Sequence, residues 1–170
     1  MSMDTPREPV AGAPERPSVE VVSTGPVQTA GLGARLAEGA EPGHVLCLWG
    51  ELGAGKTVFA KGFGSGLGAT ETINSPTFIL MAEYPARLPL FHLDLYRLEG
   101  PADAVEGGLL DERQAAGVVL VEWPDRLGQA LPANRLDVVI DGIGDEPRHI
   151  HMTAHGEGHE GYLDLAAEPS

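Results

Sequence analysis

The sequence between residues 45 and 57 reads VLCLWGELGAGKT. Its first part, Val45–Trp49, is a run of five apolar residues, which is typical of a strand buried on both faces of a parallel sheet. Its second part, Gly50–Thr57, is rich in glycine, and the apolar spacing from Val58 to Leu67 then indicates a helix. A buried strand, a glycine-rich turn and a helix in direct succession predict an α/β fold with a partly parallel sheet.

Gly50–Thr57 fits the spacing G-x-x-x-x-G-K-[ST] of the phosphate-binding loop, or P-loop. Glycines let successive backbone N–H groups point at one place and bind phosphate oxygens, and the positive end of the next helix adds to their effect. Lys56 can reach the β- and γ-phosphates, and the Thr57 hydroxyl can coordinate Mg²⁺. No Asn-Lys-x-Asp motif that reads guanine is present, so nothing in the residues supports GTP, which favours ATP with Mg²⁺ as the cofactors. The predicted nucleotide-binding residues of the loop are Gly50, Glu51, Leu52, Gly53, Ala54, Gly55, Lys56 and Thr57.

A P-loop needs a further acidic group near the metal, usually at the end of a neighbouring parallel strand, and two carboxylates qualify. Glu122 directly follows the apolar run Val118–Val121, where a buried strand would end at a ligand crevice. Asp94 lies in a segment of alternating apolar and polar residues, on the same face as His92. From the residues alone, Glu122 also fits a helix cap or a surface carboxylate, and Asp94 also fits an ion pair on a sheet face.

Two further segments have a functional and a purely structural interpretation. The sequence Ser75-Pro76-Thr77 fits equally a simple turn and a switch-like loop that brings Thr77 toward the metal and the γ-phosphate. Trp123 fits either a cover over a nucleotide or partner surface, or an ordinary core aromatic residue at the end of a buried strand.

The composition limits the partners of this chain. Its 170 residues include 25 Asp and Glu against 11 Lys and Arg, which gives a formal charge of −14. Such a charge disfavours direct binding of nucleic acids or anionic membranes, because phosphate contacts need basic residues. The single cysteine, Cys47, lies in an apolar run and is predicted to be a core residue. No apolar stretch is long enough to span a membrane or resembles a signal peptide, so we expect a cytoplasmic protein.

The chain divides into one predicted domain and two tails. Residues 1–17 are rich in proline and predict a disordered N-terminal tail, residues 18–155 the P-loop ATPase domain, and residues 156–170 a C-terminal tail. We expect a three-layer P-loop NTPase-like α/β sheet, mixed parallel and antiparallel and flanked by helices. Further predicted strands are Val19–Ser23, Thr77–Tyr84, Leu88–Leu95, Val118–Val121, Arg135–Asp141 and Arg148–Ala154, and further predicted helices are Thr29–Glu38 and Pro101–Arg113.

Four histidines cluster near the end of the sequence: His149, His151, His155 and His159. The H-x-H spacing on a strand places two imidazoles on one face, so a metal site is conceivable. Since no cysteine lies nearby, we expect instead that these histidines face solvent on a terminal strand and tail.

Four blocks of sequence follow one another at specific spacings. They are Gly50–Thr57, Ser75-Pro76-Thr77-Phe78, His92-Leu93-Asp94-Leu95-Tyr96-Arg97-Leu98 and Val121-Glu122-Trp123-Pro124. The first block is common to many NTPases, whereas the other three at these spacings are much more specific. Together they resemble the TsaE family of bacterial P-loop ATPases, and the likeness extends over about Val19 to Ile150.

The resemblance implies an ATPase of tRNA threonylcarbamoyladenosine biosynthesis, which supports repeated cycles of the TsaB–TsaD transferase that modifies adenosine-37 and acts on tRNA only indirectly. It implies that Lys56 and Thr57 bind phosphate and Mg²⁺, that Glu122 is the second metal-side carboxylate, and that Asp94 is needed for turnover. It also implies a switch-like loop at Thr77, a nucleotide or partner contact at Trp123 and a position near the base for Thr24. Glu51 stands where the family usually has Asp.

Two alternatives use the same P-loop. A small-molecule kinase would need an acceptor pocket and usually an arginine-bearing lid, and the segment from Leu98 to Gly117 contains only Arg113. A non-catalytic adaptor would use its nucleotide state only to set partner affinity. For the ATPase, no obvious arginine finger is present apart from Arg97 as a residue to test, so slow hydrolysis is expected without partners.

Overall fold

The computed structural model describes residues 16–74, 81–97 and 112–169. Within these residues the strands are β1 (Ser18–Ser23), β2 (Val45–Trp49), β3 (Met81–Tyr84), β4 (Leu90–Asp94), β5 (Val118–Glu122), β6 (Arg135–Asp141) and β7 (Arg148–His155). The α-helices are α1 (Pro26–Ala37), α2 (Lys56–Leu67) and α4 (Gly161–Ala167), and the 3₁₀ segments are η1 (Glu112–Ala116) and η2 (Pro124–Ala130). None of the helices in these ranges is long and apolar enough to cross a membrane.

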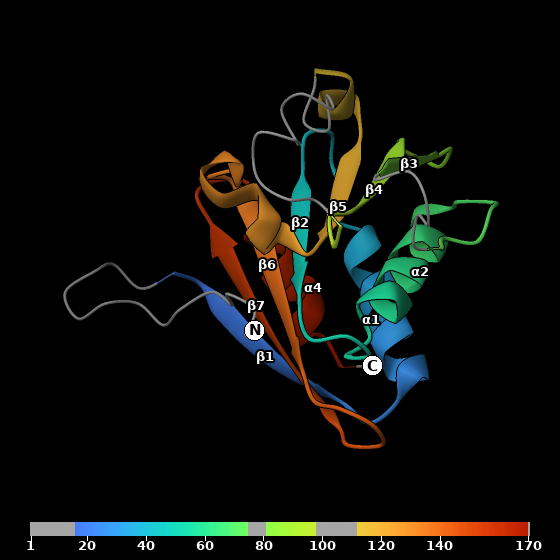
Figure 1. The fold of residues 1–170 in the computed structure, drawn as a ribbon, viewed down its shortest axis with the longest axis vertical. Coiled ribbons are helices and arrows are strands. Elements are labelled where there is room, and N and C mark those ends of the chain that lie inside the picture. The colour runs from blue at the N-terminus through green and yellow to red at the C-terminus, as the bar shows by residue number, and fades with distance from the viewer. Residues whose placement is uncertain (1–15, 75–80, 98–111, 170) are drawn as a thin grey trace.

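The strands form one mixed sheet in the order β1-β7-β6-β2-β5-β4-β3 (Figure 1). The four strands β6, β2, β5 and β4 run parallel to one another, whereas β7 and β1 at one edge and β3 at the other pair antiparallel. The predicted mixed α/β sheet is therefore confirmed. Because the parallel strands all end at the same edge, the residues that follow β2, β4 and β5 come together there.

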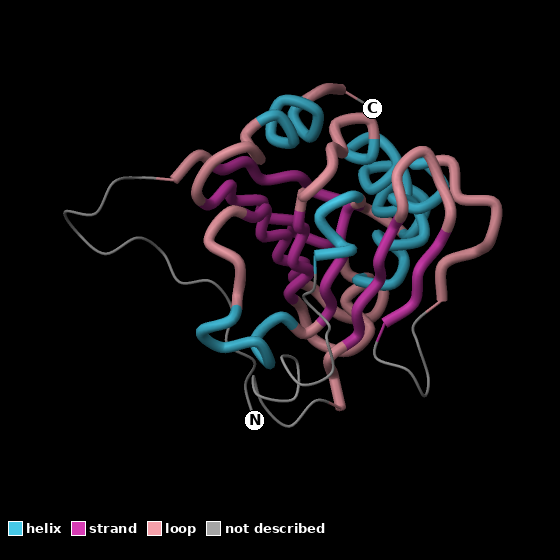
Figure 2. Tube along the Cα trace, turned by 90° about the horizontal axis from the view of Figure 1, so that it is seen from above, coloured by secondary structure: helices cyan, strands magenta, loops and turns pink. Residues whose placement is uncertain are grey.

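The two faces of the sheet are covered differently. Leu46 and Leu48 of β2 pack into the cluster that contains the apolar residues of α1, α2 and α4. Cys47 and Trp49 point to the opposite face, where Leu127 of η2 covers them. Figure 2 shows the α-helices on one side of the sheet and η2 on the other. In the described part of the chain, the second covering layer is thus a 3₁₀ segment and not an α-helix, and Cys47 is a fully buried core residue as predicted.

Glycines bring α1 and α2 into close contact. A Cβ atom at Gly62 would lie 2.0 Å from the carbonyl oxygen of Ala30, and one at Gly66 would lie 2.4 Å from that of Ala34. Since no real Cβ makes such contacts, only glycine permits this separation of the two helices. The packing places the start of α2, and with it the P-loop, against the start of α1.

The C-terminal segment differs from the prediction of a tail. Residues of α4 bury Tyr162, Leu163 and Ala166 in the main core, beside α1 and β1. This helix is not predicted from the sequence because its seven residues carry too little apolar periodicity. The predicted N-terminal tail lies outside the described residues except for its last two, and so does the predicted helix Pro101–Arg113 except for its end.

Candidate functional site

The P-loop connects β2 to α2 as predicted. Gly53 and Gly55 have φ angles of 82° and 114°, a region that side chains disfavour, and Gly55 directly precedes the first residue of α2. At Gly50, a Cβ would lie 2.8 Å from the carbonyl oxygen of Ile140 on β6. The glycines of the motif are therefore required by backbone conformation and by the close approach of the neighbouring strand.

Lys56, the first residue of α2, is buried with 5% of its surface exposed. Its Nζ donates a hydrogen bond of 2.5 Å to the carbonyl oxygen of Gly50 and lies 3.5 Å from the centre of the Trp123 ring. Burial lowers the pKa of Lys56, while the negative charges of Glu122 and Asp94 act in the opposite direction. The ammonium group is thus held over the loop between a carbonyl group and an aromatic face, with incomplete solvation.

Two carboxylates meet the start of α2 from neighbouring strands. Glu122, the last residue of β5, is 3% exposed, and its two oxygens lie 3.4 and 3.5 Å from the hydroxyl oxygen of Thr57. Asp94, the last residue of β4, is paired with Glu122 in the β4–β5 register and accepts a hydrogen bond from the backbone N–H of Tyr96. Burial raises the pKa of Asp94, and the adjacent charge of Glu122 adds to this effect. The predicted residues Lys56, Thr57, Asp94 and Glu122 are therefore brought together.

The oxygen groups at this point fit a magnesium ion. Mg²⁺ prefers oxygen ligands and usually takes only one or two protein groups, while water and phosphate oxygens complete its coordination. The hydroxyl of Thr57 and the carboxylate of Glu122 converge to supply such a pair. No cluster of three or more His, Cys, Asp or Glu residues that could hold a metal by itself occurs in residues 16–74, 81–97 and 112–169.

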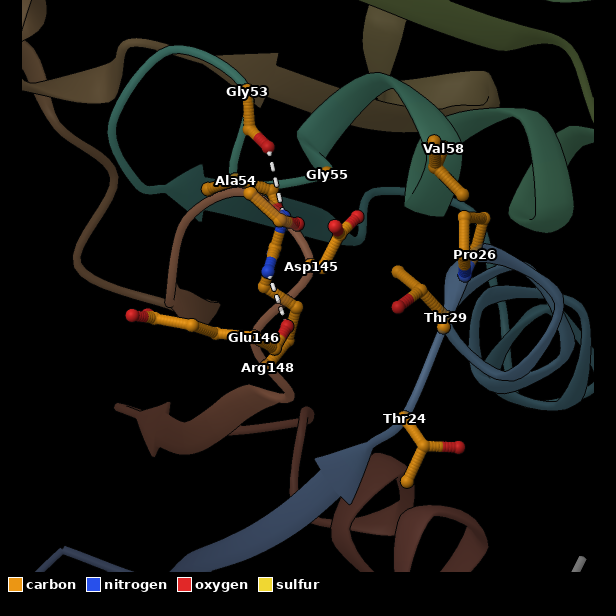
Figure 3. A pocket seen from close by; sticks show the side chains of 12 residues that line it. Thr24, Pro26, Thr29, Gly53, Ala54, Gly55, Val58, Asp145, Glu146 and Arg148 are labelled. Carbon is orange, nitrogen blue, oxygen red and sulfur yellow. Dashed lines mark hydrogen bonds between the residues drawn. The ribbon is translucent and has the colours of Figure 1, made fainter.

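A cavity of about 240 Å³ opens on the other side of the P-loop (Figure 3). Its walls are residues 53–55 of the loop, Thr24 and Thr29 at the entrance to α1, and the connection between β6 and β7, including Asp145. Thr24 thus lies beside the P-loop, where the sequence analysis expected a segment that approaches the base. Its contact with a base remains a prediction.

A family model described as threonylcarbamoyl adenosine biosynthesis protein TsaE matches residues 23–150. The chain belongs to the TsaE family. It is 45% identical over 136 residues to the Bacillus subtilis tRNA threonylcarbamoyladenosine biosynthesis protein TsaE, with 79% of this chain and 85% of the relative covered. The protein of the same name from Streptomyces coelicolor is 41% identical over 133 residues, covering 74% and 90%. The crystal structure of Bacillus subtilis YdiB superposes with a TM-score of 0.72 at 36% identity, covering 91% of this chain and 97% of YdiB.

Arg148 is a residue of this TsaE-family site that the sequence analysis missed. From the start of β7, its guanidinium group donates hydrogen bonds to the carbonyl oxygens of Ala54 at 2.9 Å and Gly53 at 3.3 Å (Figure 3). It also donates to the carbonyl oxygens of Gly144 and Glu146 in its own loop. Arg148 therefore ties the P-loop to the β6–β7 connection. No sequence spacing signals this role, because Arg148 lies more than 90 residues from the loop.

Trp123 adopts a positive φ of 59°, which is rare for a residue other than glycine. Its ring is 8% exposed, contacts the ring of Tyr96 at a centroid distance of 5.0 Å and covers the Lys56 ammonium. The tight turn after β5 thus directs the aromatic ring toward the P-loop. Trp123 also belongs to the buried apolar cluster that contains Cys47 and Leu127, so the interpretation as a core aromatic residue is confirmed, while a nucleotide or partner contact stays a prediction.

The four histidines near the end of the sequence fall into two groups. His149 and His151 have about half of their side chains exposed, as predicted. The prediction is wrong for His155, whose Nε2 lies 2.7 Å from the buried Asp137 carboxylate, and for His159, which is 3% exposed. The His155 side chain is 12% exposed because β7 pairs with β6 beside Asp137, and His159 is buried because α4 folds back over the start of β2.

The switch-like residue Thr77 lies outside the described residues, so its predicted role stays a prediction. His92, by contrast, is described and is fully buried directly behind Glu122. The alternation of apolar and polar residues places His92 on the face of Asp94 but predicts no role for it. The signal that identifies it is tertiary, since the contact joins two neighbouring strands that lie 30 residues apart.

Proposed function

We propose that this chain binds ATP with Mg²⁺ and hydrolyses it as an accessory subunit of tRNA threonylcarbamoyladenosine biosynthesis, supporting the TsaB–TsaD transferase in the cytoplasm. The observation that carries the proposal is the meeting of Lys56, Thr57 and Glu122 at the carboxyl edge of the sheet. A buried ammonium, a hydroxyl and a carboxylate beside a glycine-rich loop form the arrangement that nucleotide hydrolysis requires. The pathway is supported by the family to which the chain belongs.

Each group has a defined task in this proposal. Lys56 exchanges its hydrogen bond to Gly50 for the phosphate oxygens, and the backbone N–H groups of the loop hold the same phosphates. Thr57 and Glu122 hold Mg²⁺, which when bound neutralises charge on the phosphates. Asp94, beside Glu122 and half-buried, is proposed to be needed for turnover, by polarising the attacking water, orienting the switch-like loop or contacting a partner. Thr77 is proposed to belong to a switch-like loop that brings it toward the metal and the γ-phosphate.

Hydrolysis by the isolated chain is expected to be slow. Arg148 is the arginine that lines the cavity, and its guanidinium already donates to four backbone carbonyls. It therefore serves the loop and not the phosphates. Apart from Arg97, which stays a residue to test, the charge that stabilises the transition state is proposed to come from a partner, and an acidic chain of net charge −14 is suited to basic partner surfaces.

The test follows phosphate release from ATP with Mg²⁺, first with the chain alone and then with TsaB and TsaD. We expect slow release that increases with the partners and disappears in Lys56→Ala and Glu122→Ala. Phosphate that appears on an added metabolite would support a kinase instead, and nucleotide binding without hydrolysis even with partners would support an adaptor. Normal hydrolysis by Lys56→Ala would refute the site.

A further inference from the structure

Glu122 is held from behind by a histidine. His92 of β4 has no exposed surface, and its Nε2 lies 2.6 Å from Oε2 of Glu122. The neighbouring side chains of β4, Leu90, Phe91 and Leu93, are buried apolar groups. A polar ring in such a strand is costly unless it is hydrogen-bonded, and the only hydrogen bond of His92 among the described side chains is to Glu122.

Both oxygens of the Glu122 carboxylate face the Thr57 hydroxyl, and one of them also bonds to His92. Oε2 is bonded to His92 and lies 3.5 Å from the hydroxyl oxygen of Thr57, and Oε1 lies 3.4 Å from that hydroxyl oxygen. Asp94, next to Glu122 in the register, carries a like charge that would favour turning the two carboxylates apart. The short bond to His92 opposes this rotation and keeps Glu122 directed at the start of α2.

We propose that His92 is a positioning residue, which fixes the Glu122 carboxylate in the orientation that binds the nucleotide-associated divalent cation. The proposal rests on the proposed function and names the residue that prepares its metal site. His92 touches neither phosphate nor metal in this arrangement and acts through Glu122 alone. Groups that orient a metal-binding carboxylate in this way typically change metal affinity or activity by about 10–100-fold when they are removed.

Three substitutions separate this role from packing. In His92→Gln, the amide nitrogen lies close to the position of Nε2 and can still donate to Glu122, whereas in His92→Asn the amide is too short and corresponds to Nδ1. In His92→Leu, the side-chain volume is kept and the donor is lost. Gln and Asn are both neutral amides, so a difference between these two variants reports the bond to Glu122 and not polarity.

The measurement is the affinity for a fluorescent, slowly hydrolysed ATP analogue in excess MgCl₂ and in excess EDTA. Thermal unfolding of each variant serves as the check on folding. We expect the gain in affinity produced by Mg²⁺ to fall about 10–100-fold in His92→Leu and His92→Asn, while the affinity in EDTA stays within about twofold of the wild type. His92→Gln should recover the gain to within a few-fold of the wild-type value.

These measurements distinguish a failure of the proposed function from a failure of the role proposed for His92. A wild-type chain that binds no nucleotide under either condition refutes the proposed function and this inference together. A wild-type chain that binds, with the same magnesium gain in all three variants, refutes the inference alone. Equal losses in His92→Gln and His92→Asn, or a loss of affinity in EDTA as large as that in MgCl₂, would also overturn it. If His92→Leu fails to fold, the comparison of the Gln and Asn variants still decides the question.

Discussion

The two ends of strand β2 carry buried polar clusters of opposite character. At its start, the backbone N–H of Val45 donates to Nε2 of His159, and Nδ1 of His44 lies 2.6 Å from the hydroxyl oxygen of Tyr162. At its end, the P-loop leads to Lys56 and to the adjacent carboxylates Glu122 and Asp94. The first cluster, His44–His159–Tyr162, is called the α4 cluster below, and the second the P-loop cluster.

The groups of the α4 cluster are neutral and hydrogen-bond within the protein, so this end of β2 is called the closed end. Burial lowers the pKa of both His44 and His159, so the rings are neutral near pH 7, and burial keeps the Tyr162 hydroxyl protonated by raising its pKa. Neutral groups that hydrogen-bond to one another lose little on burial. This end of β2 therefore contributes stability by fastening α4 to the sheet.

The P-loop cluster instead contains partly buried charged groups beside a loop that is proposed to bind a charged ligand, so this end of β2 is called the open end. An ammonium with a lowered pKa faces two neighbouring carboxylates, one of which has a raised pKa. Charges buried side by side with few internal hydrogen bonds reduce the stability of a fold, and groups perturbed in this way mark functional sites. The comparison teaches that the same strand is stabilised at one end and prepared for a charged ligand at the other.

The largest effect is expected from a substitution in the α4 cluster, at the closed end of β2. Tyr162→Ala should lower the free energy of unfolding by about 3–5 kcal/mol, because a fully buried aromatic ring leaves a cavity. Urea denaturation measures the loss, and the affinity of the folded protein for ATP should not change. The control Tyr162→Phe removes only the hydrogen bond to His44 and should cost about 1 kcal/mol. A loss of ATP affinity in these variants would show that the two ends are coupled.

The next largest effect is expected from a substitution in the P-loop cluster, at the open end of β2. Lys56→Ala should reduce ATP hydrolysis by roughly 10²–10³-fold, since it removes the positive group closest to the phosphates. Its free energy of unfolding should stay equal or rise, because a buried ammonium group is removed. The matched control is Lys61→Ala, at the exposed lysine on the same helix, which should hydrolyse ATP at the wild-type rate. Loss of stability in Lys56→Ala would contradict the description of this end as open.

A smaller effect is expected for Asp94→Asn. The substitution removes the like charge beside Glu122, so the free energy of unfolding should be unchanged or raised by less than about 1 kcal/mol. Turnover should fall roughly tenfold, equivalent to about 1.4 kcal/mol in the barrier. Phosphate release and urea denaturation on the same samples test both statements. Glu83→Gln, at an exposed carboxylate on β3, is the control and should change neither.

The smallest effect is expected in the pH dependence of the free energy of unfolding, to which the two histidines of the α4 cluster contribute. Since the folded pKa values of His44 and His159 lie below the ordinary value, the unfolded chain binds more protons as the pH falls below about 6.5. The free energy of unfolding should therefore be highest above pH 6.5 and fall on acidification, by at most about 1.4 kcal/mol per pH unit for each histidine. Replacing both by Gln should reduce this slope, which urea denaturation at a series of pH values measures.

Much of the fold follows from local sequence patterns. The apolar run Val45–Trp49 is β2 to the residue, and Val118–Val121 differs from β5 only by the added Glu122. Buried parallel strands are recognisable because both faces are apolar. The short helix α4 was missed because its helical character depends on the core that it joins, and local propensity over seven residues is weak.

The functional site likewise contains residues that local sequence identifies and residues that only the tertiary structure reveals. Lys56 and Thr57 could be identified from the spacing of one loop, and Glu122 from its position after a buried strand, because each signal lies within a few residues along the chain. Arg148 carries no local signal, and the alternation that places His92 on the face of Asp94 does not reveal its partner. Their roles come from hydrogen bonds to Ala54 and to Glu122 that span 94 and 30 residues, respectively.

By itself, the sequence determined that this protein has a P-loop between a buried strand and a helix, two candidate carboxylates and a charge unsuited to binding nucleic acids. These properties depend on residue type and short spacing, which backbone geometry and composition translate directly into structure. Only the tertiary structure decided that β4 lies beside β5, so that Asp94, His92 and Glu122 meet, and that α4 closes the far end of β2. Strand order and side-chain contact arise from packing between distant segments, which no local pattern records.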